Sequence, residues 1–324
     1  MSEVKKRRSK FHRPLAQERV PLQLRDDDFA ILELFGPSRY EYLTAEMIAS
    51  ILGRPLNGIQ HRCRTLWDHE FLNRFFPMYS VGAGGSPKAI YTRGSRGSAV
   101  LRDRCGQAFT SLAIDTAVYH PFLQHTLETN WFRSLVHALC RERPDIRLGL
   151  EYLDHRFVTR FSAIEMVRRA NGQIAERTIR CTVDPDYFFS IMRDGQPPIN
   201  YFVEIQRASR KTKVSSSLFT RSVQIKFRDY VQLYRQRKLE LSSSADHPDA
   251  RELKNMRVLI VTDMSDREHE NLISLARSLD ERGKGLRLFW FARLRDFDLS
   301  KPKSLIASVW RTPVVGDALM SILS

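Results

Sequence analysis

Two strand-like stretches decide the fold of this chain, and they read Cys181-Thr-Val-Asp-Pro-Asp-Tyr-Phe-Phe189 and Tyr201-Phe-Val-Glu-Ile-Gln-Arg207. Asp194-Gly195 lies between them, and an Asp-Gly pair between two strands is typical of a β-hairpin turn. Because alternate residues of a strand share one face, we expect Asp184 to point to the same side as Asp186. Glu204 and Gln206 are expected to share a face for the same reason.

Asp186 and Glu204 are candidate metal ligands. Adjacent antiparallel strands would bring both carboxylates within reach of one hard cation, and Mg²⁺ is commonly held by one or two carboxylates together with water and phosphate oxygens. Such an ion generates hydroxide and stabilises the leaving oxygen in phosphodiester cleavage. The hairpin therefore predicts a Mg²⁺ or Mn²⁺ site that can support phosphodiester cleavage. In the alternative interpretation, Asp184 merely ends a strand and Glu204 pairs with Arg207 or Arg228.

The elements around this hairpin mix helical and strand patterns. We therefore expect residues 115–324 to form one domain of the α/β or α+β class, built on a mixed sheet. Its expected elements are an amphipathic helix region at 115–143, strands from about Arg147, a helix at Arg221–Lys238, a buried strand at Arg257–Thr262, an exposed loop at Ser242–Asp249, a helix at Asp266–Asp280 and a strand at Leu286–Ala292.

Residues 26–110 have the element order of a winged helix-turn-helix domain. Asp26 to Asp28 are expected to cap a first helix, which Gly36-Pro37-Ser38 ends. Thr44 starts a second helix that Gly53 terminates. A third helix runs from about Asn57 to His69 with Ile59, Cys63 and Leu66 inward, and a β-hairpin follows it. Tyr91, Thr92, Gly97 and Leu101 resemble the closing motif of many winged-helix regulators, although Gly94 comes one residue early.

The third helix and the hairpin carry the side chains expected to bind double-stranded DNA. Asn, Gln and Arg form bidentate contacts with base edges in the major groove, which admits one α-helix. The glycine-rich loop Gly82–Pro87 would form the tip of a wing over the phosphate backbone. In the alternative interpretation, the domain binds another protein or dimerises. The candidate DNA-binding residues here are Asn57, Gln60, His61, Arg62, Arg64, Arg74 and Lys88.

Charge supports a nucleic-acid partner. The net charge is +15 and the pI is about 9.9, and a polyanion is the simplest partner for such a surface. Residues 1–25 form a basic arm, and a second basic segment, with Arg207, Lys211 and Lys213, follows the acidic hairpin. No apolar run is long enough to span a bilayer and no signal peptide is recognisable, so we expect a cytoplasmic protein that does not bind membranes. The four cysteines show no zinc or disulfide spacing.

The hairpin resembles the PD-(D/E)XK nuclease superfamily. Pro185-Asp186 matches the "PD" and Glu204-Ile205-Gln206 matches "E-x-K", with Gln206 in place of the lysine that orients water or offsets charge. The resemblance implies Asp186, Glu204 and Gln206 as catalytic residues. It also implies Lys226, on the following helix with Tyr230 as its neighbour, as a migrated lysine, and Glu128 as an additional acidic metal ligand from the preceding helix.

The whole chain, over about residues 25–295, resembles the replication-relaxation family of plasmids and integrative mobile elements. The resemblance rests on Tyr91-Thr92, His125–Asn130, Asp184–Asp186, Val203–Arg207 and Lys226–Tyr234. It implies a metal-dependent DNA endonuclease or nickase in replication, transfer or transposition, with other proteins of such a complex as partners, and it allows a homodimer. A non-catalytic regulator that uses a nuclease-like fold as a scaffold, without a cofactor, is the alternative that Gln206 favours. A third alternative is an assembly subunit.

Overall fold

The computed structural model divides into two compact units, Met1–Ala138 and Leu139–Ser324, which are described separately below. The described parts hold seven α-helices and three sheets, one of them mixed, so the expected mixed α+β fold is confirmed. The sequence placed the domain boundary between residues 110 and 115, whereas the two units meet within a helix. The structure describes residues 13, 21–36, 39–76, 88–106, 123–153, 157–168, 171–207, 216–236, 255–279 and 286–323.

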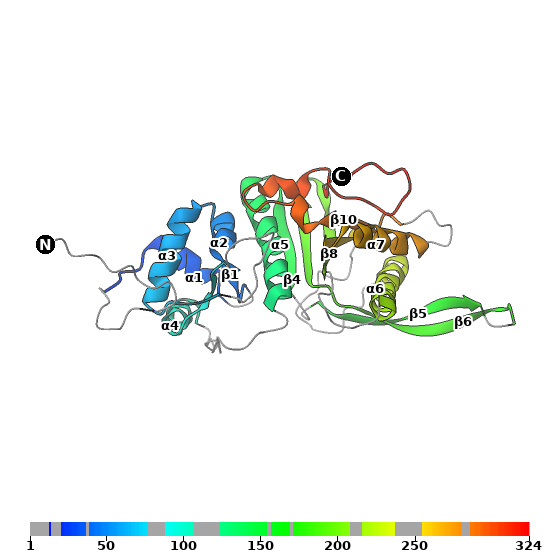
Figure 1. Cartoon of the computed structure of the whole chain (residues 1–324), viewed down its shortest axis with the longest axis horizontal. Helices are drawn as coiled ribbons and strands as arrows, with labels where there is room; N and C mark the ends of the chain where they lie inside the picture. Colours follow the sequence, from blue (N-terminus) through cyan, green and yellow to red (C-terminus); the bar gives the residue numbers. More distant parts are fainter. Residues whose placement is uncertain are drawn as a thin grey trace. The chain divides into compact units, whose positions relative to one another are not determined.

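The first unit combines helices with a small antiparallel sheet of strand order β1-β3-β2. Figure 1 labels its helices α1 to α4 and the strand β1. The sequence predicted the helices and the β2–β3 pair, but not the short strand β1 or the helix α4. In chain order the elements are α1 (Asp26–Glu33), β1 (Leu43–Thr44), α2 (Ala45–Leu52), α3 (Leu56–Asp68), β2 (Leu72–Phe75), β3 (Ile90–Arg93), α4 (Ser95–Cys105) and the start of α5 (Leu123–Glu142).

The ends of α2 and the inner face of α3 follow the sequence signals. Thr44 caps α2, because its Oγ1 accepts a hydrogen bond of 3.4 Å from the backbone N–H of Met47. Gly53 ends the helix in the left-handed conformation at φ 63°. The side chains expected inside α3, Ile59, Cys63 and Leu66, are all buried. These predictions are confirmed.

The acidic run before α1 acts differently from the expectation. Asp26, Asp27 and Asp28 lie inside the first helical turn, and Arg25 occupies the position before it. Asp28 still satisfies the helix end, because its Oδ2 accepts a 2.9 Å hydrogen bond from the backbone N–H of Arg25. Asp28 therefore caps the amino terminus of α1 from inside its first turn, and not from the position before the helix.

Two glycines allow α4 to start against the turn between α3 and β2. A Cβ added at Gly94 would lie 2.2 Å from the carbonyl oxygen of Glu70, and one at Gly97 would lie 2.1 Å from that of Phe71. Both distances are shorter than van der Waals contact, so only glycine fits without moving the backbone. The closing motif seen in the sequence therefore has a packing cause at both positions.

The amino-terminal part of α5 packs on the first unit. Leu123 and Leu127 form a buried cluster with Ile90 of β3. The Asn130 side chain donates a 2.9 Å hydrogen bond to the carbonyl oxygen of Tyr42, and Arg133 donates one of 2.8 Å to that of Arg39. These contacts explain why the start of a helix expected in the second domain belongs to the first unit.

The second unit is built on a five-stranded mixed sheet of order β10-β9-β8-β7-β4. β8, β9 and β10 are parallel, whereas β7 pairs antiparallel with both β8 and β4. The elements are the end of α5, β4 (Arg147–Leu153), β5 (Thr159–Arg168), β6 (Ile174–Val183), β7 (Tyr187–Arg193), β8 (Gln196–Arg207), α6 (Ser216–Gln236), β9 (Met256–Asp263), α7 (Asp266–Ser278), β10 (Phe289–Arg293) and the 3₁₀ turns η4 (Leu294–Asp296) and η5 (Pro302–Ile306).

The strand assignment around Asp186 needs a correction. Asp184, Pro185 and Asp186 were expected inside one strand, but they form the link between β6 and β7. Pro185 has no backbone N–H to donate to a strand partner, which disfavours a continuous strand there. Cys181 to Val183 belong instead to β6, which pairs with β5 in a separate two-stranded ribbon. The Asp194-Gly195 turn between β7 and β8 is confirmed.

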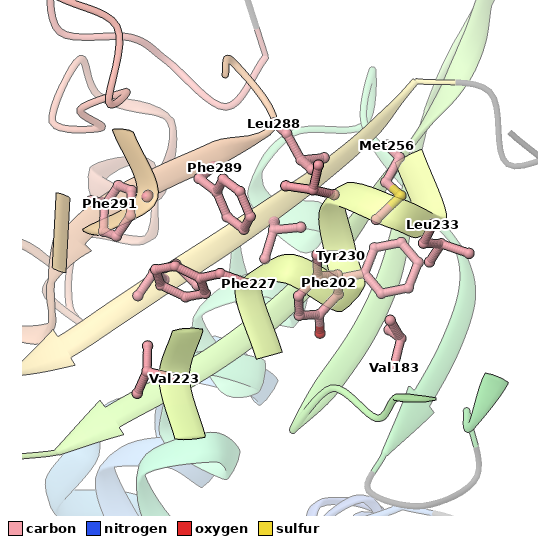
Figure 2. Close-up of a cluster of buried hydrophobic side chains, with 14 of the residues drawn as sticks. Val183, Phe202, Val223, Phe227, Tyr230, Leu233, Met256, Leu288, Phe289 and Phe291 are labelled. Carbon is pink, nitrogen blue, oxygen red and sulfur yellow. The ribbon is translucent and has the colours of Figure 1, made fainter. Parts of the chain in front are cut away.

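A large apolar core lies between the sheet and the helices α6 and α7. Figure 2 shows Phe202 of β8 and Phe227 and Tyr230 of α6 in this core, with Phe289 and Phe291 of β10. All five of these side chains are fully buried. The core fixes α6 across the carboxyl half of β8, which decides where the polar side chains of α6 meet the strand.

The carboxy-terminal segment closes the second unit. The Tyr201 hydroxyl donates to the carbonyl oxygen of Ile322, and Arg257 donates a 2.8 Å hydrogen bond to the same oxygen. Trp310 is fully buried and donates from its indole nitrogen to the carbonyl oxygen of Leu305 at 3.0 Å. Among the described helices of either unit, none is long and apolar enough to cross a membrane.

Candidate functional site

Asp186 and Glu204 lie at the same end of the β7–β8 hairpin. Tyr187 pairs with Val203 in the antiparallel register, so Asp186 stands directly beyond this pair, opposite Glu204. The backbone N–H of Ile205 donates a 2.7 Å hydrogen bond to Asp186 Oδ2. The acidic pair proposed from the sequence is thus brought together, although Asp186 lies just before the strand and not within it.

Glu204 is completely buried and both of its carboxylate oxygens are bonded to α6. Lys226 Nζ pairs with Oε2, and the Tyr230 hydroxyl donates a 2.6 Å hydrogen bond to Oε1. Lys226 and Tyr230 are four residues apart on the helix, so they reach the strand from the same side. The alternative pairing of Glu204 with Arg207 or Arg228 is not what the structure shows, because Arg228 pairs with Asp229.

Glu204, Lys226 and Asp186 form a charged cluster in which the neighbouring charges change the pKa values of Glu204 and Lys226. Burial raises the pKa of Glu204 to about 7, although Lys226 lowers it, and Asp186 adds to the rise. Burial lowers the pKa of Lys226, but the charges of Glu204 and Asp186 outweigh this, so its pKa is raised overall. Lys226 keeps a third of its side chain exposed whereas Glu204 keeps none. Desolvation therefore weighs more heavily on the carboxylate of Glu204 than on the ammonium group of Lys226.

Asp184 belongs to the same electrostatic group. Its charge raises the pKa values of both Lys226 and Tyr230, together with the charges of Glu204 and Asp186. Burial is the largest cause of the high Tyr230 pKa, so the phenol stays protonated and acts as a hydrogen-bond donor. The charges of three carboxylates therefore act on one ammonium group and one phenol.

Gln206 and Arg207 continue β8 beyond the acidic pair. Both side chains are half-buried. They lie opposite Thr262 and Asp263 at the carboxyl end of the parallel strand β9. Gln206 shares its strand face with Glu204, as the alternation predicted. Lys211 and Lys213, expected to bind DNA beside this edge, lie outside the described residues.

The donor set at this edge fits a hard divalent cation held by few protein ligands. Asp186 and Glu204 offer carboxylate oxygens, which are the ligands that Mg²⁺ prefers, and Mg²⁺ usually keeps several waters or phosphate oxygens. Among the described residues, no three His, Cys, Asp or Glu side chains gather as a metal cage. Any cation at this edge would therefore share Glu204 with Lys226 and complete its coordination from water or substrate.

Glu128, the additional acidic ligand implied by the nuclease resemblance, lies on the part of α5 in the first unit. Its side chain is buried, and its Oε1 accepts a 3.0 Å hydrogen bond from Gln124. The two carboxylates of the β7–β8 hairpin lie in the second unit. The role of Glu128 as a third metal ligand therefore stays a prediction.

One face of α3 carries the polar side chains expected to read DNA bases. Asn57, Gln60 and His61 are exposed and Arg64 is half-buried. Positions 57, 60, 61 and 64 follow the helical spacing of three and four residues, so the four side chains form one stripe. The opposite side of the helix is buried through Ile59, Cys63 and Leu66 in the first unit. This stripe is the outward-facing surface that we name the α3 face.

Arg62 is the exception among the predicted residues of α3. Its guanidinium pairs with the completely buried Asp28 of α1, and its Nε donates to Asp28 Oδ1 at 2.8 Å. This two-point contact ties α3 to α1 and favours a structural role for Arg62. Sequence reasoning missed this role because the partners lie 34 residues apart.

Arg74 and Lys88 are also engaged within the first unit. The Arg74 guanidinium lies 3.6 Å from the centre of the Trp67 ring, and Arg13 of the basic arm lies 5.6 Å from the same ring. Burial lowers the pKa of Arg74, the Tyr91 hydroxyl raises it, and the charge of Arg64 adds to the lowering. Lys88 pairs with Glu46 at 2.9 Å and stays about half exposed. Arg13 and Arg74 thus place positive charge at the end of α3.

Comparison with known proteins identifies one family. The family model described as Replication-relaxation matches residues 38–242, which is more than half of the 324-residue chain. The match covers α2, α3, the β7–β8 hairpin and α6. No curated protein and no solved structure matches the chain.

Proposed function

This chain belongs to the replication-relaxation family, and we propose that it is a DNA-binding protein of a plasmid or mobile element that cleaves DNA with the help of a divalent cation. In this proposal the first unit is a winged helix-turn-helix domain that binds double-stranded DNA. The second unit is a nuclease-like domain that hydrolyses a phosphodiester bond during replication, transfer or transposition.

The observation that carries the proposal is the convergence of Asp186, Glu204 and Lys226. Two carboxylates and one ammonium group at the edge of a sheet are the groups that hold a metal ion and offset phosphate charge. The lysine comes from the helix after the strand, which compensates for Gln206 at the usual lysine position. The lysine that the nuclease resemblance implied as migrated is the one in contact with Glu204.

The order of elements supports a PD-(D/E)XK-like core. A helix, three antiparallel strands, a crossing helix and a parallel strand follow one another as α5, β4, β7, β8, α6 and β9, with the β5–β6 ribbon inserted. In the first unit, three helices followed by an antiparallel strand pair support a winged helix-turn-helix. The two domain types are each consistent with binding to DNA.

Each residue of the site has a separate role in the proposed hydrolysis. When bound by Asp186 and Glu204, Mg²⁺ or Mn²⁺ supplies positive charge at the leaving oxygen and lowers the pKa of a water molecule. Lys226 holds a positive charge beside the scissile phosphate. The Tyr230 hydroxyl orients the Glu204 carboxylate, and Gln206 is placed on the same strand face to hydrogen-bond the attacking water.

A non-catalytic regulator is the second candidate function, and one observation favours it. Both oxygens of Glu204 are already bonded, one to Lys226 and one to Tyr230. A buried carboxylate that is neutralised within the protein does not need a metal ion. In this case the nuclease-like unit is a scaffold for DNA or protein binding, and only the first unit recognises the DNA sequence.

Mn²⁺ binding separates the two candidates. We expect the wild-type chain to bind one Mn²⁺ at this site in a calorimetric titration, and Asp186→Asn to weaken that binding by about 10-fold or more, because it loses one charged ligand. Asp194→Asn is the matched control, since Asp194 is exposed at the opposite end of the same hairpin. Equal Mn²⁺ affinity in the wild type and Asp186→Asn, or no binding by either, would support the scaffold.

A further inference from the structure

β5 and β6 form a two-stranded ribbon that is separate from the main sheet. Each strand has ten residues, and the register runs from Thr159 opposite Val183 to Arg168 opposite Ile174 without interruption. Figure 1 shows the ribbon extending beyond α6 within the second unit. Such a ribbon has two faces, which alternate residue by residue along each strand.

The inner face of the ribbon is anchored to α6. Ala163, Ile179 and Cys181 form a buried cluster on this side. The backbone N–H of Thr182 donates a 2.9 Å hydrogen bond to Asp229 Oδ2, and Gln236 donates one of 2.9 Å to the carbonyl oxygen of Ser162. These contacts fix which face of the ribbon points outward.

The outer face is exposed along its whole described length. Near the turn it carries Ile164, Met166 and Ile174, whose side chains are 62%, 60% and 69% exposed. Met166 lies opposite Glu176, so Ile174 is its diagonal neighbour, and Ile164 is the next residue on the same face. The three side chains form one apolar stripe at the far end of the ribbon.

The other end of the outer face is basic. Arg160 and Arg180 are both exposed there and are diagonal neighbours, because Arg160 pairs with Thr182 and Ser162 pairs with Arg180. On the inner face, Glu165 is already paired with Arg177. Counting the turn, residues 159–183 contain five arginines and two glutamates. At its anchored end the outer face therefore presents two arginines, and at its far end it presents the apolar stripe with the exposed Glu176 beside it.

We propose that the outer face of the β5–β6 ribbon is a second duplex-DNA contact surface. The major groove of DNA admits a two-stranded β-ribbon, and proteins that deform DNA place apolar side chains against or between base steps. Arg160 and Arg180 bind backbone phosphates, and Ile164, Met166 and Ile174 pack within the groove. The inference rests on the proposed duplex binding and adds a contact that neither the α3 face nor the acidic site supplies.

Charge and area favour DNA over a second copy of the chain. Two such ribbons packed face to face in the same direction would bring arginines of the same charge together. The outer face is about 30 Å long and about 10 Å wide, or about 300 Å², which is below the roughly 800 Å² per partner of a stable protein interface. A duplex complements the charge and accepts a narrow ribbon.

Salt-dependent duplex binding tests the inference. We expect the double variant Arg160→Ala/Arg180→Ala to reduce the slope of log affinity against log salt by about 2, and to lower the affinity on the order of 10-fold at about 0.1 M salt. The variant Ile164→Thr/Met166→Thr keeps strand-forming residues, and we expect it to weaken binding with an unchanged slope. Fluorescence anisotropy with a labelled duplex and the full chain gives both quantities.

The control is Arg147→Ala/Arg295→Ala, which removes two exposed arginines that pair with carboxylates elsewhere in the second unit. We expect it to bind as the wild type does. Wild-type affinity and slope in the ribbon variants would overturn the inference while leaving the proposed function intact. Absence of salt-dependent binding by the wild type would overturn both. A wild-type dimer that Ile164→Thr/Met166→Thr converts to a monomer, with unchanged DNA affinity, would show an interface between copies instead.

Discussion

Lys226→Met is expected to lower the free energy of unfolding of the chain by about 3 kcal/mol, because removal of one partner from a buried ion pair leaves the other charge uncompensated. Glu204 is fully buried and Lys226 is its charged partner. The Tyr230 hydroxyl bond remains in the variant, but it cannot replace a full positive charge. Urea denaturation followed by circular dichroism measures the loss.

The double variant Glu204→Gln/Lys226→Met is the control for this pair. It removes both charges with little change in volume, so we expect it to be more stable than Lys226→Met alone. A Lys226→Met variant as stable as the wild type would contradict the pairing. The pairing would also be contradicted if the double variant lost as much free energy of unfolding as Glu204→Gln and Lys226→Met lose together.

The pH dependence of stability tests the same buried carboxylate. The pKa of Glu204 is raised from 4.5 to about 7, so between these values the folded state binds more protons than the unfolded state. Stability is therefore expected to rise as the pH falls from 7 toward 4.5 and to lose this contribution above pH 7. Compared with the wild type, Glu204→Gln should show a flatter profile over this range.

The triple variant Asn57→Ala/Gln60→Ala/Arg64→Ala is expected to lower affinity for a preferred duplex by about 100-fold or more, since each bidentate base contact contributes about 1–3 kcal/mol. The three side chains lie on the α3 face, and none of them belongs to the buried side of the helix. The variant should therefore fold normally. A duplex selected by the wild type from a random pool provides the substrate for the measurement.

Arg102→Ala/Arg104→Ala on α4 is the matched control for charge in the first unit. Arg104 is half exposed and pairs with Glu33 of α1. We expect this variant to keep the sequence preference of the wild type. Equal losses in the α4 variant and the α3 variant would mean that charge alone, and not the α3 face, binds the duplex.

Local signals in the sequence predicted most of the elements. Thr44 and Gly53 bound α2 as expected, and Asp194-Gly195 joins β7 to β8. Ser265 caps α7 through a 3.4 Å hydrogen bond from the backbone N–H of Glu268, close to the helix start read from the sequence. These features depend on neighbours a few residues away, so the sequence pattern contains their cause.

Features that depend on distant partners were not predictable in the same way. Arg62 was predicted to bind DNA because it lies on α3 among other polar residues. The sequence pattern does not show that it pairs with Asp28 of α1. The β5–β6 ribbon was not recognised, since the strand pattern before Pro185 was assigned to the main sheet. The helical spacing placed Tyr230 beside Lys226, but only the packing of α6 on β8 shows that both bond to Glu204.

Cleavage of supercoiled plasmid tests most directly whether the Asp186–Glu204–Lys226 cluster is a nuclease site. The wild type is expected to convert plasmid to nicked or linear forms in Mg²⁺ or Mn²⁺, a chelator is expected to stop the reaction, and Asp186→Asn is expected to slow it by about 1,000-fold. Asp194→Asn should cleave like the wild type. Intact plasmid after incubation with a wild-type chain that binds duplex DNA and Mn²⁺ would contradict the account, as would equal cleavage by Asp186→Asn.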